Sequence, residues 1–390
     1  MPQAPQPTIQ ETYIMINAFT PHASPNWVLL EHPALHATCL YTTRFTGTVR
    51  GVAHCNSTRQ DPHAQGLAMD LVRYPDLGLS AIDVGDAVQA GELVNAFWTV
   101  FILDKLWAVA LGASSSITDH ISGVPISTPW PLSMEAYEEV RISRADADRE
   151  SDRHAGSIQG QRATSAGNNT SPVSSVLADA STADDLAGST PLTLRAKACI
   201  LFFRASLLAA QYQNEMPHAN LFWSQFNTLD NLINAFIANF PPIPVLSRDT
   251  SERLVASTIA RVATVQLHVR FVGEQARSRQ RCLIAASAIV TSIRDVRSND
   301  LGFIDPIMAI LLSSAGQVII SEMKATGTAP TIVTGPEQSA GHADSLNQIL
   351  AVMADFGPIC PLMGWSSSLM LMENGLTNRS SLPSISGRRN

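Results

Sequence analysis

The chain has 390 residues, of which 45% are hydrophobic and only 15% are charged, so it can bury a sizeable core in one large domain or in two. Its formal net charge of −7 argues against a surface that binds nucleic acid or another polyanion unaided, because such surfaces are usually basic. The five cysteines lie far apart and are odd in number, which argues against a disulfide framework and favours a reducing intracellular compartment.

No segment of the sequence indicates that the protein is exported or inserted into a membrane. The N-terminus, from Met1 to Pro7, is polar and proline-rich, whereas a signal peptide is first basic and then apolar. The longest apolar candidate is interrupted by Asp104 and Lys105, so no charge-free run reaches the ~18 residues of a membrane span. We therefore expect no membrane association.

In the N-terminal third of the chain, the sequence predicts a disordered segment followed by helices. Residues 1–26 are rich in proline and poor in charge, and we expect them to be disordered. A first helical half is predicted over 27–144. It opens with a helix over 27–45, and a second helix is expected over 65–73.

The stretch from Glu92 to Gly112 predicts one long helix that is apolar nearly all round. Glu92 is expected in the first turn, where a carboxylate suits the positive end of the helix dipole, and Gly112 at the left-handed cap. A helix that is apolar on every side is buried among other helices. After it, Pro125, Pro129 and Pro131 favour an extended path.

The second half of the chain predicts further helices behind an insertion. Residues 145–190 are rich in small polar residues and nearly lack large apolar ones, so we expect a disordered insertion. A second helical half follows over 191–372, and the tail 373–390 is expected to be mobile. No strand-like alternation is found, so the predicted fold class is all-α. Its helices are expected over 192–212, 221–240, 251–271, 281–294, 306–324 and 345–356.

The central helix and the segment after it carry a recognisable set of residues. A glutamate, a Phe-Trp pair, a second phenylalanine and an Asp-Lys pair precede a terminal Leu-Gly, a small polar loop and an Ile-x-x-Pro-x-Pro segment. This set resembles the middle homology region of fungal zinc-cluster transcription factors, the fungal-specific transcription factor domain, with lysine where arginine is commoner. The set consists of Glu92, Phe97, Trp98, Phe101, Asp104, Lys105, Leu111, Gly112, Ile126, Pro129 and Pro131.

Two later features also resemble basidiomycete members of that family. One is a Phe-x-x-Leu-Asp sequence that ends at Asp230 and is followed by Pro241 and Pro242; the other is the sequence Gln-Leu-His ending at His268. The resemblance implies a multi-helical regulatory domain in a nuclear, zinc-dependent, sequence-specific regulator of RNA polymerase II transcription. It also implies a small-molecule effector or co-regulator proteins as partners.

The zinc cluster of that family holds two zinc ions through six cysteines that include two Cys-x-x-Cys pairs. In this chain no cysteine lies within three residues of another, so we expect neither zinc nor DNA to be bound by this chain itself. We expect either a cluster encoded upstream of Met1 or a regulatory remnant. The alternative is a stand-alone α-helical ligand-binding or protein-interaction module that does not contact DNA.

We predict no catalytic, cofactor-binding or metal-binding residues. Gly-x-Ser-x-Gly, His-Glu-x-x-His, P-loop and Gly-x-Gly-x-x-Gly motifs are absent, so an enzyme is not expected. His32, His36 and Cys39 share one helix face and form the one metal candidate considered, but ordinary, partly buried side chains are the favoured interpretation. The serine runs 114–116 and 366–368 are expected in loops or caps.

Asp104 is the polar exception on the apolar helix, because a buried carboxylate is costly unless it is paired. An ion pair with an arginine of a neighbouring helix is the favoured interpretation, and a ligand contact or hinge is the alternative. Lys105 is expected to point elsewhere, since adjacent helical residues do not face each other. Trp98 and Trp107 are expected in the core, with a small-molecule pocket as the alternative.

The expected insertion contains the sequence Ser171-Pro172, which matches a proline-directed phosphorylation site. A tolerated surface insertion without a regulatory role is the favoured interpretation.

Overall fold

The structure is a computed structural model that describes residues 87–139 and 171–373, with short gaps inside both ranges. Within these residues 80% of the chain is helical, which confirms the all-α fold class. The expected N-terminal disorder, the helices over 27–45 and 65–73, and the tail after 373 lie outside the described residues.

The described elements are helices joined by short connections, apart from one small pairing of strands. β1 (His120–Ile121) pairs antiparallel with β2 (Val124–Pro125) in the connection after the first described helix, and residues 134–139 form a further helical segment. The helices are α4 (Ala87–Leu111), α6 (Pro172–Ala178), α7 (Ala183–Ala187), α8 (Pro191–Ala210), α9 (Ala219–Ala238), α10 (Thr250–His268), η1 (Val269–Phe271), α11 (Ala276–Ile293), α13 (Ile307–Ala325), α14 (Glu337–Phe356) and α15 (Pro361–Glu373).

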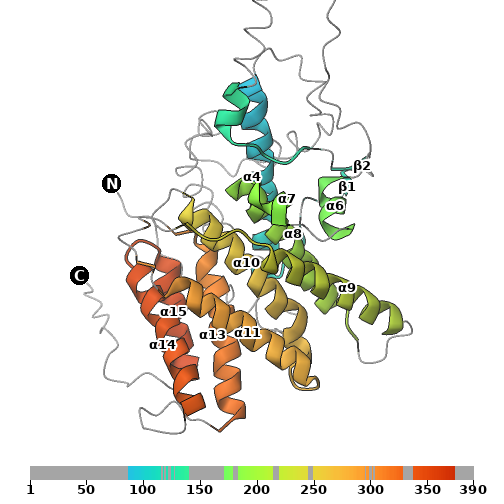
Figure 1. The fold of residues 1–390 in the computed structure, drawn as a ribbon. Helices are drawn as coiled ribbons and strands as arrows, with labels where there is room; N and C mark the ends of the chain where they lie inside the picture. The colour runs from blue at the N-terminus through green and yellow to red at the C-terminus, as the bar shows by residue number, and fades with distance from the viewer. Residues whose placement is uncertain are drawn as a thin grey trace, which may run out of the picture.

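Helix α10 is the element on which the others assemble (Figure 1). It packs against α8, α9, α11 and α13, and its contact with α8 is the most extensive in the described structure. Ala256, Ala260 and Ala263 are almost wholly buried on α10. Side chains this small allow neighbouring helices to approach closely, because interaxial distance depends on the side chains at the contact.

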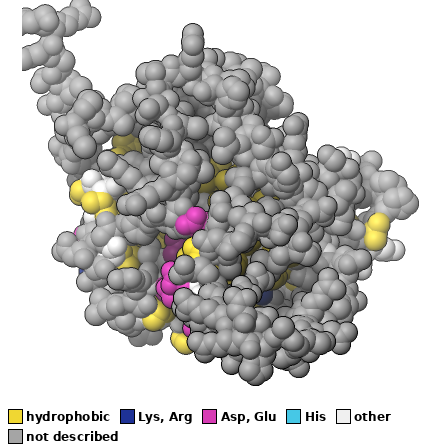
Figure 2. Space-filling model, turned by 90° about the horizontal axis from the view of Figure 1, so that it is seen from above, with side chains coloured by type: hydrophobic (Ala, Val, Ile, Leu, Met, Phe, Trp, Pro, Cys, Tyr) yellow, Lys and Arg dark blue, Asp and Glu magenta, His cyan; other side chains and the backbone are white. Residues whose placement is uncertain are grey.

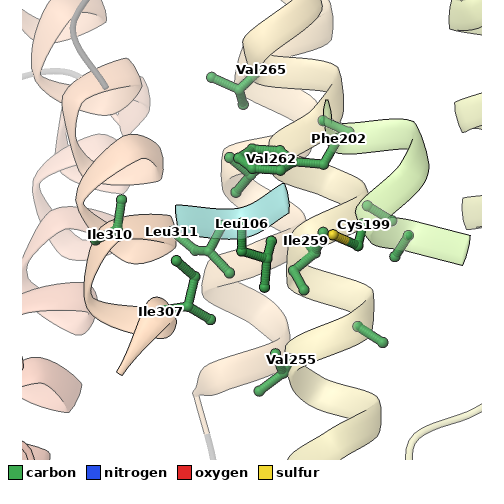
Figure 3. Packing of buried hydrophobic residues seen from close by; sticks show 14 of the residues in the cluster. Leu106, Cys199, Phe202, Val255, Ile259, Val262, Val265, Ile307, Ile310 and Leu311 are labelled. Carbon is green, nitrogen blue, oxygen red and sulfur yellow. The ribbon is translucent and has the colours of Figure 1, made fainter. Parts of the chain in front are cut away.

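Four helices meet in the hydrophobic core (Figure 3). Leu106 of α4 lies beside Cys199 of α8, Ile259 of α10 and Leu311 of α13, and each of these four residues is at most 1% exposed. The two halves predicted from the sequence are therefore packed together: α4 from the first half lies on α8 from the second.

Helix α4 confirms the predicted long helix and corrects its start. It ends at Leu111, and Gly112 has the expected left-handed conformation with φ of 61°. It begins at Ala87, however, so Glu92 does not lie in its first turn. Gly91, which was expected to precede the helix, is inside it and packs against the ring of Tyr137.

The C-terminal helices α13, α14 and α15 pack against one another (Figure 1). α14 starts before the predicted residue 345, and α15 was not predicted at all. The expectation of a loop or cap at Ser366–Ser368 is therefore wrong. Ser367 and Ser368 both donate a hydrogen bond to the Gly364 carbonyl inside α15, which offsets the low helix propensity of the serine run.

Two short helices, α6 and α7, lie inside the stretch 145–190 that was expected to be disordered, so that prediction is wrong for the described part of it. Val173, Val176 and Leu186 are at most 5% exposed, and α6 packs on α8. Pro172 occupies the first position of α6, where proline is favoured. Because three well-placed apolar side chains supply the burial, the average composition of the segment was misleading.

Helices α4 and α13 are long and apolar enough to cross a membrane by length and composition. However, 61% of the residues in the apolar window of α4 and 72% of those in α13 are buried inside the protein. Core helices of soluble proteins have the same character, so these two helices are weak evidence for a membrane span.

Replacement of Gly91 by alanine should destabilise the fold. The added Cβ would lie 2.5 Å from Cγ of the Tyr137 ring, and we expect this overpacking to cost about 1–3 kcal/mol in free energy of unfolding, measured with urea.

Gly341→Ala is the matched control, because this helical glycine of α14 has no atom within 4 Å of an added Cβ. It should stabilise the protein by about 0.5–1 kcal/mol through helix propensity. Equal effects of the two substitutions would contradict the close contact between Gly91 and Tyr137.

Candidate functional site

The proline-containing segment after α4 forms hydrogen bonds with α4 and with the start of α8. The Trp98 indole Nε1 donates a hydrogen bond of 2.7 Å to the Pro129 carbonyl, and its ring stacks on Trp130 at 4.5 Å. The hydroxyls of Thr190 and Thr193 both approach the Pro131 carbonyl, at 3.0 and 2.9 Å. Trp98 is wholly buried, as expected for a core residue, and it also positions the segment that carries the Pro-x-Pro residues.

Asp104 and Lys105 together hold the small polar loop that follows α4. The Ser115 hydroxyl donates to Asp104 Oδ2 at 2.5 Å and accepts from Lys105 Nζ at 2.8 Å. The Ile117 backbone N–H donates to Asp104 Oδ2, and the Ile117 carbonyl accepts from Lys105 Nζ. The prediction that Lys105 points elsewhere is therefore wrong, because one serine reaches both side chains.

Lys105 is 1% exposed, and its ammonium lies 4.3 Å from the centroid of the Phe203 ring. The aromatic face and the two loop acceptors compensate its loss of hydration. Asp104 keeps its expected role as a paired carboxylate through these loop hydrogen bonds, and the arginine partner expected for it stays a prediction. Trp107, 5% exposed, lies in the core as expected.

A second polar centre joins α9, α10 and α11 around Asp230, which is 1% exposed. His268 Nε2 lies 3.1 Å from Asp230 Oδ1, and His268 Nδ1 lies 3.0 Å from Ser278 Oγ. Arg281 donates to Oδ1 at 2.5 Å and Arg277 to Oδ2 at 3.2 Å. The two family-like features that contain Asp230 and His268 are thus in direct contact.

The hydrogen bonds at Asp230 determine its charge. Burial raises the pKa of Asp230, but the hydrogen bonds and positive charges of His268 and Arg281 outweigh burial and lower this pKa to about 2. Asp230 is therefore an ionised acceptor at neutral pH, and His268 Nε2 carries the proton that it donates. The result is a charge-assisted connection among three helices.

The order Asp230, His268, Ser278 matches the hydrogen-bond order of a hydrolase triad. Ser278 and His268 are each only 1% exposed, so no substrate reaches the Ser278 hydroxyl in this conformation. That hydroxyl also lies 3.2 Å from Gln275 Oε1, and Asp230 is shared with two arginines. The geometry serves helix packing better than nucleophilic attack.

A third buried charge pair joins α8, α10 and the start of α13. The Arg195 guanidinium contacts Asp305 and, at 3.2 Å, Glu252. Although burial lowers the pKa of Arg195, the charges of Asp305 and Glu252 outweigh it and raise this pKa. Asp305 Oδ1 also accepts the Ile307 backbone N–H at 2.9 Å, so the same carboxylate satisfies an open donor at the start of α13.

Cys199, Cys282 and Cys360 are buried free thiols. Burial raises the pKa of Cys199 and Cys282 to about 12 and that of Cys360 to about 11, so all three are inert at neutral pH. No group of three metal-ligating side chains occurs among the residues that the structure describes. His32, His36 and Cys39 lie outside them, as do Cys55 and Ser116.

Ser171 is 5% exposed, and its carbonyl accepts the Ser175 backbone N–H at the start of α6. The side chain is thus shielded from solvent in this conformation, and phosphorylation at this position stays a prediction.

Four glutamates are exposed in α4 and in the helical segment 134–139, and Figure 2 shows acidic side chains on the face seen from above. These glutamates are Glu92, Glu135, Glu138 and Glu139.

Comparison with known proteins found no matching family model, no matching curated protein and no matching solved structure.

Asp230→Asn should remove a pH-dependent part of the stability. The pKa of Asp230 falls from 3.8 in the unfolded chain to about 2 in the folded protein, so its stabilisation is complete above the unfolded value and disappears as the pH falls toward the folded one. We expect wild type to exceed Asp230→Asn by about 2 kcal/mol at neutral pH, with the difference vanishing in acid.

Urea unfolding over a pH series measures this difference. Asp344→Asn is the control, because this carboxylate is exposed on α14 and its replacement should change stability by less than about 0.5 kcal/mol at any pH. A difference for Asp230→Asn that does not depend on pH would contradict the charged connection.

Trp98→Phe should cost more stability than Trp223→Phe. Both substitutions replace an indole by a benzene ring, but only Trp98 donates a hydrogen bond in the described structure, to the carbonyl of the half-buried Pro129. We expect an additional loss of about 1–3 kcal/mol for Trp98→Phe in urea unfolding, because this carbonyl loses its donor where water reaches it poorly. Equal losses would show that the Pro129 contact contributes nothing.

Proposed function

We propose that this chain is the regulatory, middle homology domain of a fungal zinc-cluster transcription factor, and that it acts in the nucleus to control RNA polymerase II transcription. The support is the resemblance of α4 and the segment after it to that family, together with the hydrogen bonds that these residues form with one another. Trp98 meets Pro129, and Asp104 with Lys105 meets the polar loop.

The observation that carries the proposal is the contact between Asp230 and His268, at 3.1 Å. Asp230 ends the Phe-x-x-Leu-Asp sequence and His268 ends the Gln-Leu-His sequence, and the two residues are 38 positions apart. Both residues belong to the sequence order that resembles the family, and their buried hydrogen bond gives that order a structural role, which supports the proposal.

In this proposal DNA is contacted by a separate zinc module, not by this chain. The net charge of −7 and the wide spacing of the cysteines support that division. The chain is not an enzyme in this proposal. Its partners are a small-molecule effector or co-regulator proteins, and it needs no cofactor of its own.

The alternative proposal is a stand-alone α-helical module that binds a ligand or a protein partner and takes no part in transcription. The same acidic surface and helical fold support it. Transcript mapping across the 5′ end of the gene separates the two: upstream exons with six closely spaced cysteines favour the regulatory domain.

A tethering experiment tests the regulatory role directly. The full chain is fused to a heterologous DNA-binding domain in a fungal host that carries a matching reporter gene. We expect the fusion to raise or lower reporter transcription relative to the DNA-binding domain alone, because a regulatory domain acts wherever it is recruited.

The Asp344→Asn fusion should behave as wild type, and protein levels are compared by immunoblot. The purified chain alone should not retard duplex DNA at about 0.15 M salt, since its net charge is −7. A reporter unchanged at equal fusion levels contradicts the regulatory proposal and favours the alternative.

A further inference from the structure

The chain contains only three lysines, Lys105, Lys197 and Lys324, and the structure places each in a different environment. Lys105 is buried and donates to two oxygens. Lys324 is exposed near the end of α13. Lys197 is 92% buried, with 8% of its surface exposed, and its side chain makes no hydrogen bond or ion pair with any residue in the described part of the chain.

An aromatic ring and a carboxylate act on the Lys197 side chain. Its Nζ lies 5.5 Å from the centroid of the Trp130 ring, which is in turn stacked on Trp98. Asp185 of α7 is the carboxylate that acts on it electrostatically. Burial lowers the pKa of Lys197, and the charge of Asp185 opposes that change only in part.

An ammonium that loses water without gaining a hydrogen-bond acceptor is costly, and the Trp130 ring compensates that loss only in part. Burial therefore raises the fraction of neutral amine at Lys197 above that of an exposed lysine. A neutral amine has a free lone pair and is a nucleophile, which is how buried lysines become reactive. Because Asp185 already supplies negative charge nearby, a carboxylate or phosphate ligand gains little here. An uncharged electrophile fits the site better.

We propose that Lys197 is a reactive amine that forms an imine with small carbonyl compounds. Its nitrogen adds to the carbonyl carbon, the two amine hydrogens leave with the carbonyl oxygen as water, and a C=N bond remains. No oxidant or reductant is needed. The small exposed fraction of Lys197 limits the reactant to a short-chain aldehyde or a compound of similar size.

This inference does not depend on the role in transcription, and it is tested on the purified full-length chain. The probe is acetaldehyde with sodium cyanoborohydride, which traps each imine as a stable ethylamine. Peptide mass spectrometry then quantifies the label at the three lysines separately. We expect Lys197 to exceed the exposed Lys324 by at least about threefold near neutral pH, and Lys105 to remain unlabelled.

Two variants on α7 sharpen the test. Asp185→Asn removes the nearby charge that favours the ammonium, so it should raise labelling of Lys197 near neutral pH and leave Lys324 unchanged. Asp184→Asn, at the adjacent exposed carboxylate, is the matched control and should change neither. Circular dichroism verifies that both variants keep their helical content.

Preferential labelling of Lys324, with Lys197 reacting only after unfolding in urea, would overturn the proposal. Equal effects of Asp185→Asn and Asp184→Asn on the labelling of Lys197 would overturn it as well. The reactivity of Lys197 would then not depend on the charge of Asp185. The tethering experiment is unaffected by either outcome, so failure of this inference and failure of the proposed function are distinguishable.

Discussion

The close packing of α10 against α8 is the constraint on which the other elements depend. Alanines on α10 allow neighbours to approach, and α9, α11 and α13 then surround the same helix. A helix enclosed in this way has few positions at which a charged side chain reaches water. Each charge that points inward must therefore find a partner inside the protein, or its burial costs several kcal/mol.

In the described structure, buried charges are paired in small polar clusters where helices meet. Arg195 of α8 pairs with Asp305 at the start of α13. Asp230 of α9 contacts His268 of α10 and two arginines of α11. Buried pairs of this kind contribute little net stability compared with a well-packed apolar contact. They do penalise any helix arrangement that separates the partners, and in this chain they join helices that are far apart in sequence.

The periodicity of apolar residues was sufficient to predict the long helices, because α4, α8, α9, α10, α11 and α13 bury continuous apolar surface. It failed where burial is local. α6 and α7 need only Val173, Val176 and Leu186. In α15, Ser367 and Ser368 each donate a hydrogen bond to the Gly364 carbonyl. The polar contacts were not predictable, because the Asp230–His268 and Arg195–Asp305 pairs require knowledge of which helices meet. A usable signal was present in α8, where Arg195 and Lys197 lie among apolar residues.

The hydrogen bonds from Thr190 and Thr193 to the Pro131 carbonyl have a consequence for how this chain can vary in length. Thr190 follows Pro131 by 59 positions, yet its hydroxyl lies 3.0 Å from the Pro131 carbonyl. The two ends of the intervening stretch are thus tied at one point, and the entropy of closing it rises only by about 0.6 kcal/mol for each doubling of its length. A change in the number of residues between Pro131 and Thr190 therefore has little thermodynamic effect on the contact between them or on the helices that carry it.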